Sequence, residues 1–194
     1  MQRQRRDRRV ERTQALLRDA LVSLIQEKPY DSIAVKEILD RANVGRSTFY
    51  MHFRDKDDLL VLGIHDLIGS VHRRRAHTSQ KASDGIIWFS LPIFEYIEQH
   101  RRTSEAKMGR RGRAIIHEHL QRVLGDLIAD DVKKRLRTRR KPGHIPPDLL
   151  IQYVASTFTL VLNWWVETRS PLSPREINDC FRALIAPTLE ATCD

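Results

Sequence analysis

Apolar residues recur at spacings of three and four along most of the chain, whereas the alternating pattern of a half-buried strand is scarce. Leu17, Leu21 and Leu24, for example, mark one face of a helix. The pattern predicts an all-α fold of about nine helices. The expected segments are 7–26, 35–41, 46–52, a helix from Asp55 to about Thr78, 86–97 with a break at Pro92, a loop or short helix at 101–113, a long helix containing Ile115–Ile128, 148–168, and a last helix that Ser173 caps and that ends near Pro187.

Two short helical patterns, around Ile38 and Phe49, are separated by Asn43. Asn tolerates the left-handed backbone that a sharp turn between helices requires. Val44 and Phe49 are placed to fill the angle between the two helices, so the second helix keeps its polar and basic residues outside. A small basic helix held by a partner helix is what the major groove of DNA admits. The pattern therefore predicts a helix-turn-helix motif and double-stranded DNA as partner.

The residue types in this motif also resemble a known family. The matching positions are Val44, Ser47-Thr48-Phe49-Tyr50, His52-Phe53, Lys56 and Leu59-Leu60. On these residues the chain resembles the TetR family of bacterial transcriptional regulators. The resemblance implies an N-terminal helix-turn-helix DNA-binding domain (1–54) and a C-terminal helical domain for dimerisation and effector binding (55–194). Gly45 and Ala34 stand where the family usually has Ser or Thr as a helix cap, and each departure weakens a helix by a few tenths to about 1 kcal/mol.

The resemblance implies that the second helix of the motif reads DNA. Arg46 opens this helix and is expected to reach base edges, where a bidentate contact to guanine discriminates by about 1–3 kcal/mol. Three positions have a structural alternative: Ser47 as a helix cap, Tyr50 as a packing ring, and His52 at the junction with the next helix. The full set of expected DNA-contacting residues is Lys36, Arg46, Ser47, Thr48, Tyr50, His52 and Lys56.

The charge of the chain favours a polyanionic partner. It has 34 Lys and Arg against 25 Asp and Glu, a formal net charge of +9. Arginines crowd residues 3–12, which form either an arm that enters the minor groove or a solvated tail. A second basic run, residues 133–141, is interpreted as a solvated loop. The competing function is a basic scaffolding or membrane-surface protein, which salt-sensitive binding to a specific short palindrome would exclude.

The helix expected at residues 148–168 is apolar around most of its circumference, and such a helix is buried on two sides. A single recognition helix buries little surface, so specific binding normally requires two half-sites and a homodimer. The resemblance places the dimer interface on this helix and the last one, whereas the alternative is a monomeric core. The end of the chain, WWVETRSPLSPREI, also has a weaker resemblance to dihydroxyacetone-kinase regulators. The expected interface residues are Trp164, Trp165, Phe181 and Leu184.

The usual mechanism in the resembled family is repression that a small-molecule effector relieves. The alternative for the aromatic residues of the second half is that they form an ordinary hydrophobic core. An effector can shift the equilibrium between two conformations of the protein only if it binds one of them more tightly. His119 is the expected polar contact of a ligand. The residues expected to line the ligand site are Trp88, Phe89, Phe94, Met108, His119 and Phe158.

The sequence has no Gly-rich phosphate loop, Ser/His/Asp arrangement or paired metal-ligand motif, so we expect neither an enzyme nor a cofactor. Cys180 and Cys193 have no metal-ligand spacing, which fits a reducing compartment. No apolar run approaches the roughly 20 residues of a membrane span, and the arginine-rich start lacks the apolar segment of a secretory signal. We therefore expect a cytoplasmic protein without a membrane partner.

Overall fold

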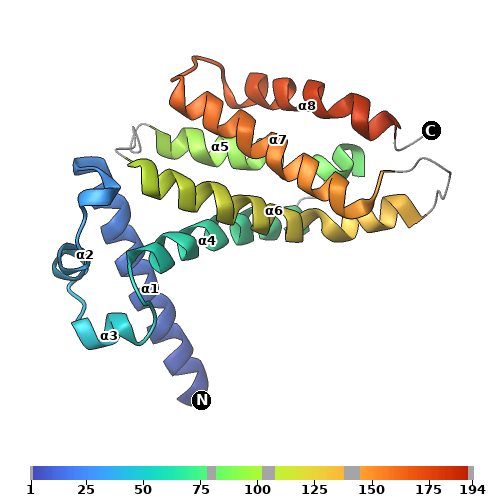
Figure 1. Ribbon diagram of the computed structural model, residues 1–194. Helices are drawn as coiled ribbons and strands as arrows, with labels where there is room; N and C mark the ends of the chain where they lie inside the picture. Colours follow the sequence, from blue (N-terminus) through green and yellow to red (C-terminus); the bar gives the residue numbers. More distant parts are fainter. Residues whose placement is uncertain (1, 78–81, 102–107, 138–144, 192–194) are drawn as a thin grey trace. The chain divides into compact units, whose positions relative to one another are not determined.

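The computed structural model describes residues 2–77, 82–101, 108–137 and 145–191. Within these residues the chain forms eight α-helices and two short 3-10 helices, with no strand, so the predicted all-α class is confirmed (Figure 1). The α-helices are one fewer than the expected nine or so. Their order is α1 (Gln2–Glu27), η1 (Tyr30–Ser32), α2 (Val35–Ala42), α3 (Arg46–Tyr50), α4 (Lys56–His77), η2 (Ala82–Ile87), α5 (Ser90–Arg101), α6 (Arg110–Arg137), α7 (Pro147–Glu167) and α8 (Pro174–Ala191).

The chain divides into two compact units. Unit 1 comprises residues 1–65 and 100–116, and unit 2 comprises residues 66–99 and 117–194. Helices α4 and α6 are each continuous and contribute one segment to either unit. This division differs from the expected boundary between residues 54 and 55, because the first turns of α4 and α6 belong to the unit that contains the helix-turn-helix.

The apolar stripe of α1 forms the centre of unit 1. Helix α1 packs against α2, and α2 packs against α3. Phe49 of α3 and Ile38 of α2 are fully buried against this stripe, and the half-buried Val44 lies in the turn between them, as expected. Burying a large apolar side chain contributes roughly 1.5–3 kcal/mol. The helix-turn-helix is therefore held from its inner side, which leaves its outer side free of any packing role.

Two helix ends in unit 1 confirm predictions made from the sequence. Asn43 adopts the left-handed conformation (φ 52°, ψ 46°) where α2 ends. Asp55 caps α4, since its Oδ1 accepts hydrogen bonds from the backbone N–H groups of Asp57 (2.9 Å) and Asp58 (3.0 Å). Both features set the direction of the chain on either side of α3.

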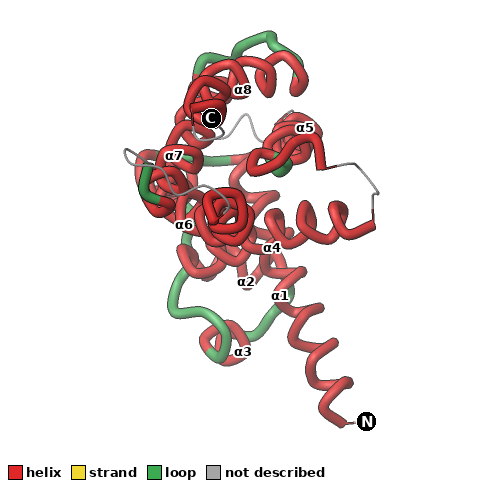
Figure 2. Tube along the Cα trace, turned by 90° about the vertical axis from the view of Figure 1, so that its right-hand side faces the viewer, coloured by secondary structure: helices red, strands yellow, loops and turns green. Residues whose placement is uncertain are grey.

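Unit 2 is built around a cluster of aromatic rings from α5, α7 and α8 and from the residue preceding α5. Phe158 lies 4.9–5.4 Å, centroid to centroid, from the rings of Phe89, Phe94 and Phe181, and Trp165 packs edge-on against Phe94 at 5.6 Å. All five side chains are fully buried. Tilted and edge-to-face ring pairs of this kind add about 0.5–1.5 kcal/mol each beyond their area burial. Helices α7 and α8 pack against each other in this unit, and Figure 2 shows α8 above α7.

The helix boundaries in unit 2 confirm one prediction and correct two. Ser173 caps α8 reciprocally: its backbone N–H donates to the Glu176 carboxylate (2.8 Å), and the Glu176 N–H donates to the Ser173 hydroxyl (3.4 Å). Pro92 does not break a helix, because α5 begins at Ser90 and the proline lies in its first turn, where a backbone N–H has no helical partner. Helix α8 does not end near Pro187 but continues to Ala191.

Helix α7 alone, among the described helices, is long and apolar enough to cross a membrane by length and composition. Eight of its residues are buried within the fold, including Phe158 and Trp165 of the aromatic cluster. The core helix of a soluble protein passes the same test. Burial therefore accounts for the apolar residues on one face of α7, whereas Leu149, Tyr153, Leu160 and Trp164 of the same helix are exposed.

Candidate nucleic-acid interface

Helix α3 holds its polar residues outward through one buried anchor. Phe49 is fully buried, whereas Arg46, Ser47 and Tyr50 are exposed and Thr48 is half-buried. Gly45 precedes the helix in an extended conformation and makes no side-chain cap. The helix has only five residues, so a single ring fixes its rotation about its own axis. The geometry gives α3 one side for packing and one side for a partner.

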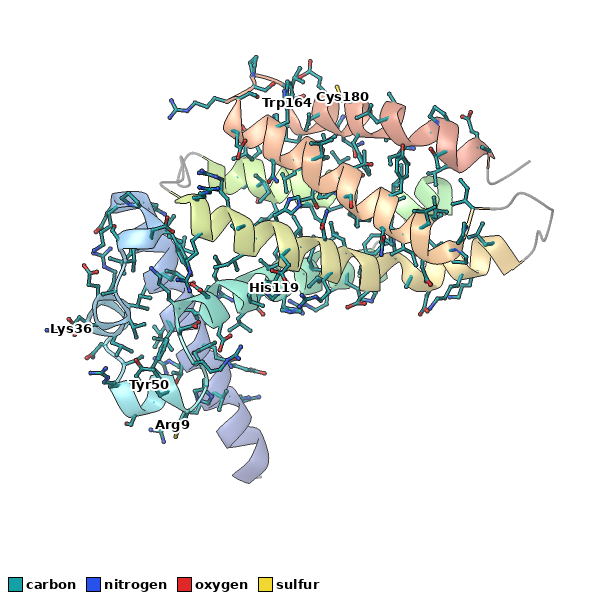
Figure 3. The ribbon with its side chains drawn as sticks, in the orientation of Figure 1. Arg9, Lys36, Tyr50, His119, Trp164 and Cys180 are labelled. Carbon is teal, nitrogen blue, oxygen red and sulfur yellow. The ribbon has the colours of Figure 1, made fainter. Side chains whose placement is uncertain are left out.

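Lys36 and His52 lie on either side of α3 in the sequence and differ in exposure. Lys36, the second residue of α2, is exposed, and no hydrogen bond or ion pair engages it among the described residues (Figure 3). His52 is half-buried, its backbone N–H donates to the Phe49 carbonyl (2.9 Å), and its ring packs edge-on against Phe53. These contacts favour the junction alternative for His52, whereas Lys36 is available to an anion.

Lys56 does not present its charge to the outside as expected. Its ammonium donates to the backbone carbonyls of Tyr30 (2.7 Å) and Ile33 (2.8 Å) and lies 4.5 Å from the centre of the Tyr30 ring. Burial lowers the pKa of Lys56 below its ordinary value, although nearby carboxylates partly oppose this. The expected phosphate contact is therefore corrected: the three N–H donors of Lys56 hold the chain around η1 against the start of α4.

A carboxylate supplies one of the two hydrogen bonds of a capping box at the start of α2, where Ala34 has no side-chain acceptor. Glu37 accepts a hydrogen bond from the backbone N–H of Ala34 (2.9 Å) and forms an ion pair with Lys28. The hydrogen bond from Lys28 lowers the pKa of Glu37, and the Ala34 N–H lowers it further. Half of the usual capping arrangement is thus present at the start of α2 without a Ser or Thr.

A second cluster in unit 1, which the sequence analysis did not identify, joins η1, α4 and α6. The hydroxyl of the fully buried Tyr30 donates to Asp57 (2.5 Å), and Arg111 of α6 donates two hydrogen bonds to the same carboxylate (2.5 and 3.0 Å). Burial raises the pKa of the Tyr30 phenol, and the hydrogen bond to Asp57 raises it further. The bond to Asp57 raises the pKa of Arg111. This polar cluster links the first turn of α6 to the base of the helix-turn-helix.

Two glycines allow α6 to approach η1 closely. A Cβ atom on Gly112 would lie 2.9 Å from the Tyr30 ring and 2.5 Å from the sulfur of Met108, and one on Gly109 would overlap the Asp31 carboxylate. Glycine lets two backbones approach where no side chain fits. The pair Gly109 and Gly112, three residues apart at the start of a helix, is the sequence signal that predicts such an approach.

The basic N-terminus is helical. Helix α1 begins at Gln2, and Arg8, Arg9 and Arg12 are exposed on it. A helix with its side chains is about 10–12 Å across, and the minor groove is about 6 Å wide. The predicted arm in the minor groove is therefore wrong for these residues, while contact with phosphates stays open. The side chains of residues 1–7 and the basic run at 138–141 lie outside the described residues.

The residues expected to bind an effector do not form one set. Phe89, Phe94 and Phe158 belong to the aromatic cluster of unit 2, where they pack on one another. Trp88 is half-buried and donates its indole N–H to Asp131 (3.1 Å). Met108 packs against the core of unit 1 and is removed from the set. His119 lies half-buried on α6 in unit 2 (Figure 3).

Of the four residues expected in the dimer interface, two are buried within unit 2 and two are exposed. Trp165 is fully buried and donates its indole N–H to the Leu172 carbonyl (2.8 Å), and Phe181 is fully buried in the aromatic cluster. Neither reaches a partner surface, so both assignments are corrected. Trp164 and Leu184 are half exposed, at 50% and 54% of their surface. An exposed apolar stripe continues from them along α7 through Leu160, Tyr153 and Leu149.

The fold and α3 together define a helix-turn-helix regulator that binds DNA. The family model described as "Bacterial regulatory proteins, tetR family" matches residues 17–61, and the model "Transcriptional regulator C-terminal region" matches residues 88–186, just over half of the chain. The chain therefore belongs to the TetR family of transcriptional regulators. The finer resemblance to dihydroxyacetone-kinase regulators is not shown.

Individual relatives are distant. The uncharacterized HTH-type transcriptional regulator YxbF of Bacillus subtilis (strain 168) is 22% identical over 178 residues, which are 87% of this chain but only 43% of that protein. This chain thus spans less than half of that curated relative. A TetR regulator from Streptococcus agalactiae 2603V is 26% identical, with a TM-score of 0.55 over 93% of this chain and 97% of its own. RolR, solved with resorcinol, shares the fold at 22% identity, with a TM-score of 0.60 over 94% of this chain and 89% of its own.

Proposed function

We propose that this protein is a homodimeric repressor that binds a palindromic operator through two copies of α3. The observation that carries the proposal is the arrangement of α3, in which a fully buried Phe49 leaves Arg46, Ser47 and Tyr50 exposed along one side. Residues at the start of a recognition helix reach base edges, and Arg binds the O6 and N7 atoms of guanine in a bidentate manner. Lys36 and the exposed arginines of α1 add phosphate contacts, which set register without reading sequence.

The partner copy is proposed to dock on the apolar stripe of α7 and α8. The stripe consists of Trp164, Leu160, Tyr153 and Leu149 on α7 with Leu184 on α8, and the Tyr153 hydroxyl joins the two helices by donating to the Leu184 carbonyl (3.2 Å). Exposed apolar residues along one face of a helix mark an interaction site, and the aromatic residues among them suit an interface, although the exposed Ser156 lies between Tyr153 and Leu160 on this face. In a two-fold dimer the same stripe serves both copies.

Release is proposed to follow the binding of a small molecule to the aromatic cluster of unit 2. RolR was solved with resorcinol, which supports a small-molecule effector for this chain as well. The rings of Phe89, Phe94 and Phe158 pack on one another, so a ligand must replace these contacts and must bind more tightly to a conformation in which they separate. Trp88 packs edge-on against Phe89, although its indole N–H is already bonded to Asp131, and the half-buried His119 of the same unit is the proposed polar contact.

Selection of bound duplexes from a random library tests the proposal. We expect a palindrome whose two half-sites lie one helical turn apart or a multiple of it, together with affinity that falls steeply with salt. The selected duplex then serves in a screen of metabolites, including resorcinol, for release. Recovery of no consensus, with equal binding to all duplexes, contradicts sequence-specific regulation and favours a basic scaffolding protein.

A further inference from the structure

Arg46 and Tyr50 lie four residues apart on the exposed side of α3, where side chains at this spacing are neighbours. The guanidinium carbon of Arg46 lies 5.7 Å from the centre of the Tyr50 ring, within the range of a cation–π interaction. Arg46 makes no ion pair among the described residues, so the ring is the contact that orients its charge. Tyr50 itself is 48% exposed.

The Tyr50 ring is in turn held by the core of unit 1. Its ring packs edge-to-face on Phe49, with centroids 5.2 Å apart and planes at 87°, and Phe49 is fully buried. A chain of contacts therefore runs from the core through Phe49 and Tyr50 to the Arg46 guanidinium. A guanidinium held over a ring by a cation–π contact keeps N–H groups that can still make a bidentate contact to a base.

We propose that Tyr50 is a positioning residue whose ring holds the Arg46 guanidinium for base reading and so sets the preference for guanine at one position of each half-site. This inference rests on the proposed function. A freely rotating Arg loses much side-chain entropy when it binds, whereas an Arg already held over a ring has lost part of it beforehand. The ring carries this role, not the hydroxyl, which forms no hydrogen bond among the described residues.

The ring and the hydroxyl make opposite predictions. If the hydroxyl binds a phosphate, Tyr50→Phe weakens binding to all sequences equally, because phosphate contacts carry no sequence information. If the ring positions Arg46, Tyr50→Phe keeps the preference for guanine, and Tyr50→Leu lowers it about two- to fivefold, the ratio expected for an exposed cation–π contact. Only the position that Arg46 reads is affected.

The experiment measures the affinity of the full-length protein for the selected operator and for duplexes in which each guanine is replaced in turn. The proteins are wild type, Tyr50→Phe, Tyr50→Leu, Arg46→Ala and the double variant Arg46→Ala/Tyr50→Leu. We expect Arg46→Ala to abolish the preference at one position and Tyr50→Leu to reduce it there alone. In the Arg46→Ala background, Tyr50→Leu should change that preference no further. Unchanged thermal unfolding and an unchanged helical circular-dichroism spectrum confirm that the variants are folded.

Three results overturn the inference. In the first, Tyr50→Leu leaves the preference for guanine intact while Arg46→Ala removes it. In the second, Tyr50→Phe and Tyr50→Leu lower the affinity for every duplex equally. In the third, Arg46→Ala changes the base preference at no position of a palindrome that the wild type still selects. In all three the proposed regulator stands. Failure of the wild-type protein to select any palindrome overturns the proposed function itself, so the two failures are distinguishable.

Discussion

The outer surfaces of the two units differ in kind, although both units are purely helical in the described residues. Unit 1 turns Lys36, Arg46, Ser47 and Tyr50 outward, and its exposed apolar residues (Leu16, Val22 and Met51) are scattered. Unit 2 exposes an apolar stripe along α7 and α8. Polar, basic groups suit a polyanion that is read by hydrogen bonds, whereas contiguous apolar area suits a protein partner. The kind of partner that each unit suits is therefore indicated by its surface residues and not by its helical core.

The interiors differ as well. The centre of unit 2 is a set of five aromatic rings in mutual contact. In unit 1, a polar cluster of Tyr30, Lys56, Asp57 and Arg111 lies beside a core of mostly aliphatic side chains with Phe49 and Phe53. Hydrogen bonds demand a narrower geometry than apolar contacts. The polar cluster therefore fixes the starts of α4 and α6 around η1 in unit 1, whereas the rings of unit 2 are held by apolar contacts, which the proposed effector would have to separate.

The largest expected effect concerns the stripe of unit 2. Trp164→Glu places a charge in the proposed interface, so we expect monomers. Since binding two linked half-sites exceeds binding one by roughly 10²–10⁴-fold, operator affinity should fall by about that factor. Sedimentation velocity measures the oligomeric state, and a gel-shift titration measures the affinity.

Val22→Glu is the matched control, since Val22 is an exposed apolar residue of α1 in unit 1. It should keep the oligomeric state of the wild type. A Trp164→Glu protein that still sediments as a dimer would remove α7 from the interface. Trp165→Glu is not informative, because a charge at that fully buried position unfolds unit 2.

Local patterns in the sequence were sufficient for the helices and for several of their ends. Asn43, Asp55 and Ser173 act through hydrogen bonds to residues at most a few positions away, and these rules need no tertiary information. The outward side of α3 was predictable for the same reason, because Phe49 marks its inner side. These features depend on spacing along one helix.

Contacts between distant segments were not predictable. Trp164 and Trp165 are equally apolar neighbours, and only the direction of α7 in unit 2 decides which one is buried. Lys56 resembles a phosphate-binding residue until the carbonyls of Tyr30 and Ile33 are placed around it. Arg111 lies 54 residues from Asp57, and no periodicity connects them. Such pairs follow from the fold alone.

Two lysines of unit 1 separate residues proposed to contact DNA from residues that stabilise the fold. Lys56→Ala removes the donor to two half-buried carbonyl groups, so we expect a loss of about 1.5–3 kcal/mol in the free energy of unfolding. Lys36→Ala should leave stability unchanged. It should lower affinity equally for all duplexes and reduce the salt slope by about two per dimer, since each phosphate contact contributes roughly 0.9. Urea unfolding and binding at several salt concentrations measure both. If Lys56→Ala lowered the affinity for DNA and left the free energy of unfolding unchanged, Lys56 would again be a candidate DNA-contacting residue.

Two glycines of unit 1 test the close approach of α6 to η1. Gly112→Ala forces a Cβ to within 2.9 Å of the Tyr30 ring, so we expect a loss of about 1–3 kcal/mol through overpacking. Gly63→Ala on α4 is the matched control, because a Cβ there meets no atom within 4 Å. Alanine favours a helix over glycine, so this variant should gain up to about 1 kcal/mol. Urea unfolding measures both, and an equal gain in the two variants would contradict the contact.

The smallest expected effect is a dependence of stability on alkaline pH that arises from Tyr30 in unit 1. The pKa of Tyr30 is raised by burial and by the hydrogen bond to Asp57, so folding favours the protonated phenol. Its contribution to stability is fully present below the unfolded-state pKa of about 10 and is lost as the pH rises toward the folded-state pKa. Tyr30→Phe removes the hydrogen bond and the titration together. We expect it to be about 1 kcal/mol less stable than wild type below pH 10 and progressively closer to wild type above it. Urea midpoints at intervals from pH 8 to pH 11 measure the difference between the two proteins, which cancels the titration of all other groups. A difference that stays constant across pH 10 would mean that the Tyr30 phenol ionises alike in the folded and unfolded states, and that the first turn of α6 does not enclose it.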